Sequence, residues 1–175
     1  MSASFKQDVS DVAKDIVNHA IHLRGMIITS YAHIEFLLAD ICLKAWQREE
    51  YAHLAGPFPY KADTRIKAVS KLLDTDGPLK TYRPGVQPVL DELLSFEELR
   101  HFVAHGLLVV TPDPSGPRMQ YRLYRTTKHG TEIGFLETSS SELTDASLKI
   151  SGLLHQMLTT FRRIYFDLGL EFESS

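Results

Sequence analysis

The spacing of the apolar residues changes abruptly after Gly106, and this change constrains the fold more than any other feature. Before Gly106, apolar side chains recur every three or four residues, which is the period of an amphipathic helix. After it come three short segments rich in β-branched and aromatic residues: LLVVT (107–111), MQYRLYRTT (119–127) and EIGFLET (132–138). The turn-forming sequences PDPSGP and KHGT separate them. We therefore predict helices up to Gly106 and a three-stranded antiparallel meander after it.

Four helices are predicted around this meander. Their approximate bounds are 9–48, 63–74, 86–104 and a last helix that begins after Ser139 and continues to about Leu168. Ser139 and Glu142 have the spacing of a capping box at the start of that helix. The pattern is typical of a mainly α protein, an up-and-down four-helix bundle with a small antiparallel β-meander (about 107–138) inserted between the third and fourth helices. Neither a repeat nor a linker divides the chain, so we expect one domain over residues 1–175.

Charge and cysteine content narrow the functional classes. The net charge of −3 gives the whole molecule no attraction for polyanions, so nucleic-acid binding would need a local basic cluster. The single cysteine, Cys42, lies in an apolar helical pattern, which predicts a buried structural thiol in a reducing compartment. His33, Glu35 and Asp40 interrupt the most apolar stretch, so we do not expect it to span a membrane. A cytoplasmic protein is the resulting expectation.

The sequence lacks four common motifs: the phosphate loop, the dinucleotide-binding fingerprint, the nucleophile elbow and the cysteine pairs of zinc sites. We therefore expect no cofactor. Histidines and carboxylates on helices remain. Glu98, His101 and His105 place three possible metal ligands within reach of one helical face. A second Glu-x-x-His occurs at Glu50–His53, but a di-iron bundle needs inward glutamates on two further helices. A metal site that uses Glu98 and His101 is therefore only the third hypothesis, and we assign no metal.

Arg100 and His105 form a second constellation, a guanidinium and an imidazole at the end of one predicted helix. The spacing alone is uninformative, because a chain of this composition contains such a pair about once by chance. Arg48 and His53 indeed have the same spacing. Context separates the two pairs: His101 directly follows Arg100, and the motif closes a well-formed amphipathic helix. A purely structural interpretation stays open. In it, the helix dipole favours basic residues at the C-terminal end of the helix, and His101 pairs with Glu97.

In that context the stretch RHFVAHG resembles the motif of the HEPN family (higher eukaryotes and prokaryotes nucleotide-binding domain), an arginine followed by a polar residue and then a histidine after four to six residues. A long first helix with Tyr31-x-x-x-Glu35-x-x-Leu38 at its centre is also similar to that family. The resemblance implies a helical bundle that forms a homodimer and, in many members, a metal-independent endoribonuclease that acts as a toxin or defence effector.

The resemblance also implies roles for particular residues and partners. Arg100 and His105 would be the catalytic pair at a composite site of the dimer, with His101 supporting them and Tyr31, Glu35 and Glu97 as further supporting candidates. RNA would be the substrate, and an antitoxin of nucleotidyltransferase type a possible protein partner. Other family members have lost activity and only bind or scaffold, so a catalytically inactive RNA- or protein-binding or dimerisation module stays open as the alternative.

The residue types suit RNA cleavage. Attack by the 2′-hydroxyl needs a base, an acid for the leaving oxygen, and positive charge beside the phosphorane. Arg100 suits the last role, because guanidinium binds phosphate oxygens bidentately. On an ideal helix, positions i and i+5 lie about 140° apart. A cleft between two subunits therefore accommodates Arg100 and His105 more easily than a pocket within one.

The predicted hairpin offers a possible RNA track, because aromatic residues alternate there with basic ones. The residues concerned are Arg118, Tyr121, Arg122, Tyr124, Arg125 and Lys128. Strand alternation places Tyr121 and Arg125 on one face and Arg122 and Tyr124 on the other. A half-buried strand with a solvated outer face is the favoured interpretation, with Arg122 and Arg125 as the candidates for RNA binding.

Overall fold

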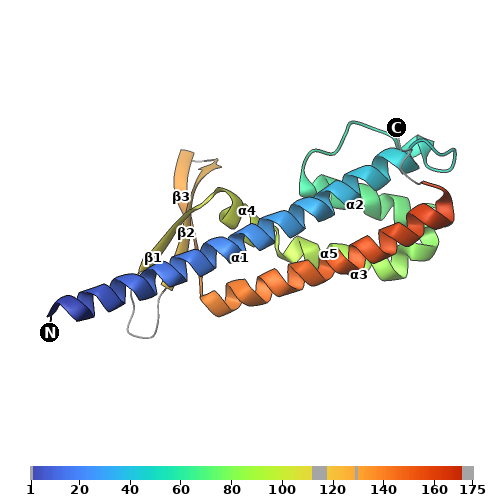
Figure 1. The fold of residues 1–175 in the computed structure, drawn as a ribbon. Coiled ribbons are helices and arrows are strands. Elements are labelled where there is room, and N and C mark those ends of the chain that lie inside the picture. The colour runs from blue at the N-terminus through green and yellow to red at the C-terminus, as the bar shows by residue number, and fades with distance from the viewer. Residues whose placement is uncertain (1, 112–117, 129, 171–175) are drawn as a thin grey trace, which may run out of the picture. The chain divides into compact units, whose positions relative to one another are not determined.

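The computed structural model describes residues 2–111, 118–128 and 130–170, and it is mainly α-helical with one small sheet (Figure 1). In chain order its main elements are α1 (Ser2–Ala45), α2 (Ala62–Asp74), α3 (Arg83–Ser95), α4 (Glu97–His105), β1 (Leu107–Thr111), β2 (Arg118–Thr127), β3 (Gly130–Thr138) and α5 (Ser140–Leu168). Two short 3₁₀ helices precede α2 and α3, namely η1 (Ala52–Leu54) and η2 (Pro78–Tyr82). The predicted class, helical with an antiparallel β insertion, is confirmed.

The chain divides into two compact units. The first unit comprises residues 1–29 and 98–149, and the second comprises residues 30–97 and 150–175. The long helices α1 and α5 each contribute to both units. The division therefore follows no break in the apolar pattern and no linker in the sequence.

The predicted third helix is two helices. α3 ends at Ser95 and α4 begins at Glu97, so the described residues contain five α-helices instead of the predicted four. Phe96 adopts φ −95° and ψ 0°, and its N–H donates to the carbonyl of Leu93, three residues back. This tight turn breaks the ladder of i to i−4 bonds. The apolar stripe continues through the break, which is why periodicity predicted one helix.

The sheet is the predicted meander. Its strands are ordered β1-β2-β3 and all pairs are antiparallel, with Arg122 opposite both Leu107 and Phe135. The turn predicted at 112–117 lies outside the described residues. The two faces differ as expected from alternation, because Tyr121 is fully buried whereas Tyr124 is 75% exposed.

The start of α5 has the predicted capping box. The Ser139 N–H donates to the Glu142 carboxylate at 2.7 Å, and the Glu142 N–H donates to the Ser139 hydroxyl oxygen at 3.2 Å. These reciprocal bonds satisfy donors that a helix N-terminus otherwise leaves unpaired. The hydrogen bonds from Ser139, first from its backbone N–H, hold the pKa of the Glu142 carboxyl below its usual value.

The second unit packs the C-terminal part of α1 against the rest through apolar residues and a few polar links. The Tyr165 hydroxyl donates to Asp40 at 2.6 Å, and Lys44 pairs with the same carboxylate at 3.2 Å. Burial, and then the bond to Asp40, raise the pKa of Tyr165. Tyr31 is buried, and its hydroxyl donates to the carbonyl of Leu93 at 3.4 Å. These bonds fix which face of α1 points into the unit.

The α1 helix contains a 32-residue stretch, Lys14–Ala45, that is long and apolar enough to cross a membrane by length and composition alone. Within its most apolar window, 44% of the residues are buried inside the protein. The core helix of a soluble protein has the same properties, so this stretch does not decide where the protein is located.

Cys42 is fully buried, as predicted for a structural thiol, and burial raises its pKa from 9.0 to about 12. The unfolded chain loses this proton near pH 9 while the folded chain keeps it. The stability that Cys42 contributes is therefore complete below pH 9 and falls by about 1.4 kcal/mol for each pH unit between 9 and 12. We expect urea unfolding of the wild type to weaken more steeply across this window than that of Cys42→Ala. Equal slopes would contradict the expectation.

Candidate functional site

The site predicted from the sequence lies on α4, and burial of the other face of this helix sets its orientation. Phe102 and Val103 are 1% and 0% exposed, so they anchor the helix in the first unit. The side chains of His101 and His105 are exposed as a consequence, and Arg100 is half-buried. The three residues of the predicted catalytic set therefore reach the surface along one short helix.

The two histidines are in contact with each other. Their ring centroids are 5.3 Å apart and the ring planes meet at 64°, an edge-to-face arrangement. This contact follows from their i, i+4 spacing. Arg100 and His105 are five positions apart, and the helical twist directs them about 140° apart. The structure thus joins His101 to His105 in a pair, while Arg100 points along a different side of α4.

Arg24 holds the C-terminal end of α4. Its guanidinium donates to the carbonyl of Ala104 at 2.9 Å and to that of Gly106 at 3.5 Å, the residues on either side of His105. The last carbonyls of a helix lack intrahelical donors and carry its negative dipole end, so a guanidinium satisfies both needs. Sequence reasoning missed Arg24; the available signal was an arginine in the middle of the apolar pattern of the first helix.

Gly106 is required for a close approach of chain segments. A Cβ there would lie 2.5 Å from the carbonyl oxygen of Phe102 and 3.2 Å from Cβ of Tyr121. The Gly106 N–H donates to that same carbonyl at 2.7 Å. Gly106 is not among the glycines with a left-handed φ, so a left-handed helix end is not the reason for a glycine here. The absence of a side chain is what lets the end of α4 meet β2.

We expect Gly106→Ala to lower the free energy of unfolding by about 1–3 kcal/mol, because the new methyl group collides with backbone. Gly25→Ala is the matched control, since a Cβ at Gly25 meets nothing within 4 Å in the middle of α1. It should stabilise the protein by about 0.5–1 kcal/mol through helix propensity. Urea unfolding monitored by circular dichroism measures both. Equal effects of the two substitutions would argue against the close approach at Gly106.

Arg125 joins α4 to the sheet. Its guanidinium lies 4.3 Å from the centre of the Phe102 ring and pairs with Glu98 at 3.0 Å. Gly134 provides the space for this side chain, because a Cβ there would lie 2.9 Å from Cδ of Arg125. Arg125, a predicted RNA contact, thus has its charge paired and its stem packed within the first unit.

The metal hypothesis requires Glu98, whose carboxylate pairs with Arg125. Among residues 2–111, 118–128 and 130–170, no group of three or more His, Cys, Asp or Glu side chains is placed to hold a metal ion. Glu98, His101 and His105 therefore do not assemble into the site that their spacing allows.

The outer face of the sheet is exposed and carries the other predicted RNA contact, Arg122. Its Nε donates to the Gln120 side chain at 2.7 Å, and its guanidinium lies 6.0 Å from the centre of the Phe135 ring. Large apolar side chains surround it on this face. They are Leu107 (68% exposed), Tyr124 (75%), Ile133 (46%) and Phe135 (56%). We call these four residues and Arg122 the outer sheet face.

The three predicted supporting residues, Tyr31, Glu35 and Glu97, all belong to the second unit. Tyr31 is bonded to the Leu93 carbonyl there, and Glu35 pairs with Arg65 at 3.2 Å. Through these two contacts, Tyr31 and Glu35 help to hold the second unit together. Glu97 is exposed at the first position of α4.

The second Arg-x₄-His match has a different setting. Arg48 lies beyond the end of α1, where it donates to the carbonyl of Leu168 at 3.0 Å and to Glu50 at 3.3 Å. His53 lies in the short helix η1. This pair is therefore not carried by one α-helix, unlike Arg100 and His105.

Comparison with known proteins yields no match to a family model, a curated protein or a solved structure. The assignment of this site therefore depends on the chemistry and geometry of its own residues.

Proposed function

We propose that this protein is a metal-independent endoribonuclease of HEPN type, active as a homodimer in the cytoplasm, with a toxin or defence role. The observation that supports this most lies on α4, where His101 and His105 are in contact and Arg100 also reaches the surface near the same helix end. Arg24 and Phe102 hold that helix end in place. A fixed arrangement of this kind is what positioned proton transfer requires.

The chemistry divides among these residues. Arg100 neutralises charge on the phosphorane, and His105 transfers the proton between the RNA oxygens and the enzyme. His101, whose ring touches that of His105, positions it and offers a second imidazole. Two imidazoles can supply a base and an acid without a metal ion.

Helix geometry supports the proposed dimer. Arg100 and His105 diverge by about 140° on α4, so one copy presents them to different sides. A second copy, related by a two-fold axis, brings Arg100 of one chain beside His105 of the other. We propose that the helices assemble in the HEPN manner around this contact, although the described residues contain five α-helices.

The outer sheet face is a suitable surface for the RNA strand. Tyr124 and Phe135 expose aromatic rings on which bases can stack, and Arg122 on the central strand β2 can hold a phosphate. This face belongs to the same unit as α4. Arg122 is therefore retained as the RNA contact, while Arg125 acts through the position of Phe102.

The proposal is tested by incubating the purified protein with total cellular RNA in the presence of EDTA. We expect cleavage with EDTA present, products that end in 2′,3′-cyclic phosphate, and a dimer by light scattering. Cleavage that EDTA abolishes would contradict a metal-independent mechanism. A nucleotidyltransferase-type antitoxin, the proposed protein partner, should suppress the cleavage when co-expressed.

A catalytically inactive binding or dimerisation module is the second candidate. The outer sheet face favours it, because four large apolar side chains exposed together are typical of an interaction surface. A stable dimer that binds RNA without cleaving it would support this alternative.

A further inference from the structure

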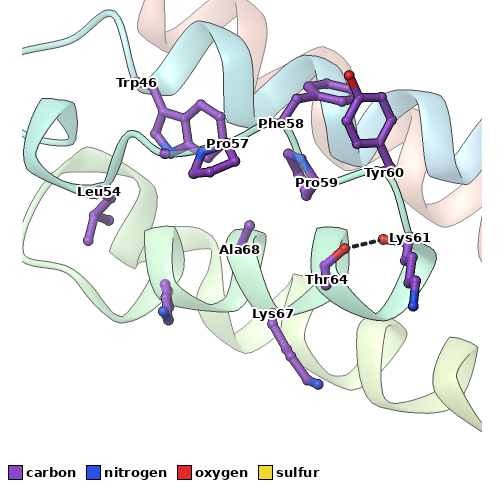
Figure 2. Close-up of a pocket in the computed structure, with 12 residues that line it drawn as sticks. Trp46, Leu54, Pro57, Phe58, Pro59, Tyr60, Lys61, Thr64, Lys67 and Ala68 are labelled. Carbon is purple, nitrogen blue, oxygen red and sulfur yellow. Dashed lines mark hydrogen bonds between the residues drawn. The ribbon is translucent and has the colours of Figure 1, made fainter.

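The second unit contains a groove that has no part in the proposed cleavage. It lies between α2 and the segment that precedes this helix, and its volume is about 580 Å³, within the usual range of ligand sites. Its lining residues are Trp46, Leu54, Gly56, Pro57, Phe58, Pro59, Tyr60, Lys61, Thr64, Lys67, Ala68 and Lys71. Figure 2 shows residues 57–60 along one side, with the α2 residues Thr64 and Ala68 across from them.

Contacts within the second unit hold the aromatic side of this groove in place. The Arg65 Nε donates to the carbonyl of Pro59 at 2.8 Å, and the Arg65 guanidinium lies 5.7 Å from the centre of the Phe58 ring. The same guanidinium pairs with Glu35 at 3.2 Å, which ties the segment to α1. The Phe58 and Tyr60 rings meet edge to face at 5.1 Å. This side of the groove is therefore ordered without a ligand, which reduces the entropy lost on binding.

The α2 side of the groove is a strip of small side chains with a lysine at each end. Thr64 and Ala68 lie in the middle of this strip, and Lys61 and Lys71 lie at its two ends. Their spacing of three, four and three residues places all four on one face of the helix. Because a helix rises about 1.5 Å per residue, the two lysines are separated by about 15 Å along its axis. A compact anion therefore cannot reach both of them.

Both terminal lysines of this strip are available to a ligand. Lys61 and Lys71 are exposed, and within the part of the chain that the structure describes neither ammonium group has a partner. Lys67 differs, because it pairs with Asp63 at 3.4 Å and extends away from the aromatic side in Figure 2. None of the lining residues is a carboxylate. The groove thus combines an apolar middle with positive charge at both ends, in a chain whose net charge is −3.

We infer that this groove binds an extended acidic segment of a partner protein, in which one apolar side chain lies midway between two carboxylates. In an extended chain, residues two positions apart point to the same face, and each residue advances about 3.3 Å. Carboxylates four positions apart are therefore separated by about 13 Å, close to the axial separation of Lys61 and Lys71. The side chain midway between them faces Thr64 and Ala68. The recognised pattern is acidic-x-apolar-x-acidic.

Charge complementarity selects this occupant over other ligands. The two carboxylates pair with the two lysines, while the apolar side chain fills the space between Ala68 and the aromatic side. An uncharged apolar peptide would leave both lysines without a partner. The inference is independent of the proposed ribonuclease activity, since every residue that lines the groove belongs to the second unit.

Fluorescein-labelled synthetic peptides test the inference by anisotropy with the full-length protein. The probes have the sequence Ala-Glu-Thr-Leu-Thr-Glu-Ala, with isoleucine, methionine or phenylalanine replacing the leucine in three further peptides. We expect saturable binding that weakens as the salt concentration rises. Replacing both glutamates with glutamine, or the leucine with alanine, should weaken binding at least about tenfold. His105→Ala should bind the probes as the wild type does, which separates this test from that of the proposed cleavage.

Reversing the charge of both lysines should reverse the preference for the peptide. The double variant Lys61→Glu, Lys71→Glu should lose the acidic probe and bind a probe in which lysines replace the two glutamates. The matched control is Lys128→Glu, Lys149→Glu, which changes the net charge equally at exposed positions of the first unit. It should retain the preference of the wild type.

A second pair of variants locates the apolar part of the site. Ala68→Leu fills the groove from α2 and should weaken binding at least about tenfold, whereas Ala32→Leu at an exposed position of α1 should not change it. Thermal unfolding of each variant verifies that it is folded, and light scattering measures its oligomeric state.

Three results would overturn the inference. One is the absence of saturable binding by all four acidic probes. Another is equal affinity of the wild type for the glutamate and glutamine peptides, because the lysines would then have no role in recognition. The third is the conversion of a dimer to a monomer by Ala68→Leu but not by Ala32→Leu, which would assign the groove to a second copy of the chain.

Discussion

Replacing His105 with alanine is expected to lower the rate of RNA cleavage by about 100-fold or more, the usual contribution of a positioned acid or base. His105 is exposed at the end of α4, so the substitution removes the imidazole without opening a cavity. Cleavage of a labelled RNA, followed in EDTA, measures the rate. Arg100→Ala should have an effect of similar size, because the guanidinium stabilises charge that develops in the transition state.

The chain supplies a matched control for this substitution. His53 follows Arg48 at the same spacing as His105 follows Arg100 but lies outside an α-helix, so His53→Ala should cleave RNA at the wild-type rate. An equal loss in His53→Ala and His105→Ala would contradict a specific role for His105.

Mixing the two inactive variants tests the composite site. A heterodimer of Arg100→Ala with His105→Ala retains one intact site only if the two residues come from different chains. Equal mixing should then restore about a quarter of the wild-type activity, since half the dimers are mixed and each has one of two sites. No recovery would show that each copy provides both groups to its own site or that the site requires four intact residues.

Phe102→Ala is expected to lower the free energy of unfolding by about 3–5 kcal/mol, a large share of the stability of a protein of this size. The Phe102 ring is 1% exposed, lies 4.3 Å from the Arg125 guanidinium and fills the space beside Gly134. Its removal leaves a cavity between α4 and the sheet. It also removes the aromatic surface on which Arg125 packs.

Phe135→Ala is the matched control, because it removes the same side chain from the same unit where 56% of it is exposed. Its cost should stay below about 1 kcal/mol, since most of the ring is already in water. Urea unfolding by circular dichroism compares the two variants. Similar losses would contradict the assignment of Phe102 as the anchor of α4.

Features determined by neighbouring residues were predictable from the sequence. The meander follows from alternation and turn residues, and its register agrees with the predicted faces of Tyr121 and Tyr124. The capping box of Ser139 and Glu142 needs only a three-residue spacing. Burial of Cys42 follows from its place in an apolar helical stripe. In each case a pattern within a short stretch of chain is enough for the prediction.

The candidate site was predictable only in part. A helical spacing of four places His101 against His105, so their contact was implicit in the sequence. The pairing of Glu98 with Arg125 joins residues that are 27 positions apart, and no local pattern indicated it. In this pair Glu98 and Arg125 engage each other, a contact that neither the metal hypothesis nor the RNA-binding hypothesis included.

The sequence by itself thus indicated which stretches form α-helices and strands and which face of the sheet is buried, because both depend on the period of the apolar residues. Tertiary structure decided where the helix breaks at Phe96, how Arg24 holds the end of α4, and how Arg65 binds the carbonyl of Pro59 in the segment before α2. Those features depend on donors and acceptors that meet across long stretches of chain. Arg24 and Ala104 are 80 positions apart, and only folding brings the guanidinium to the carbonyl.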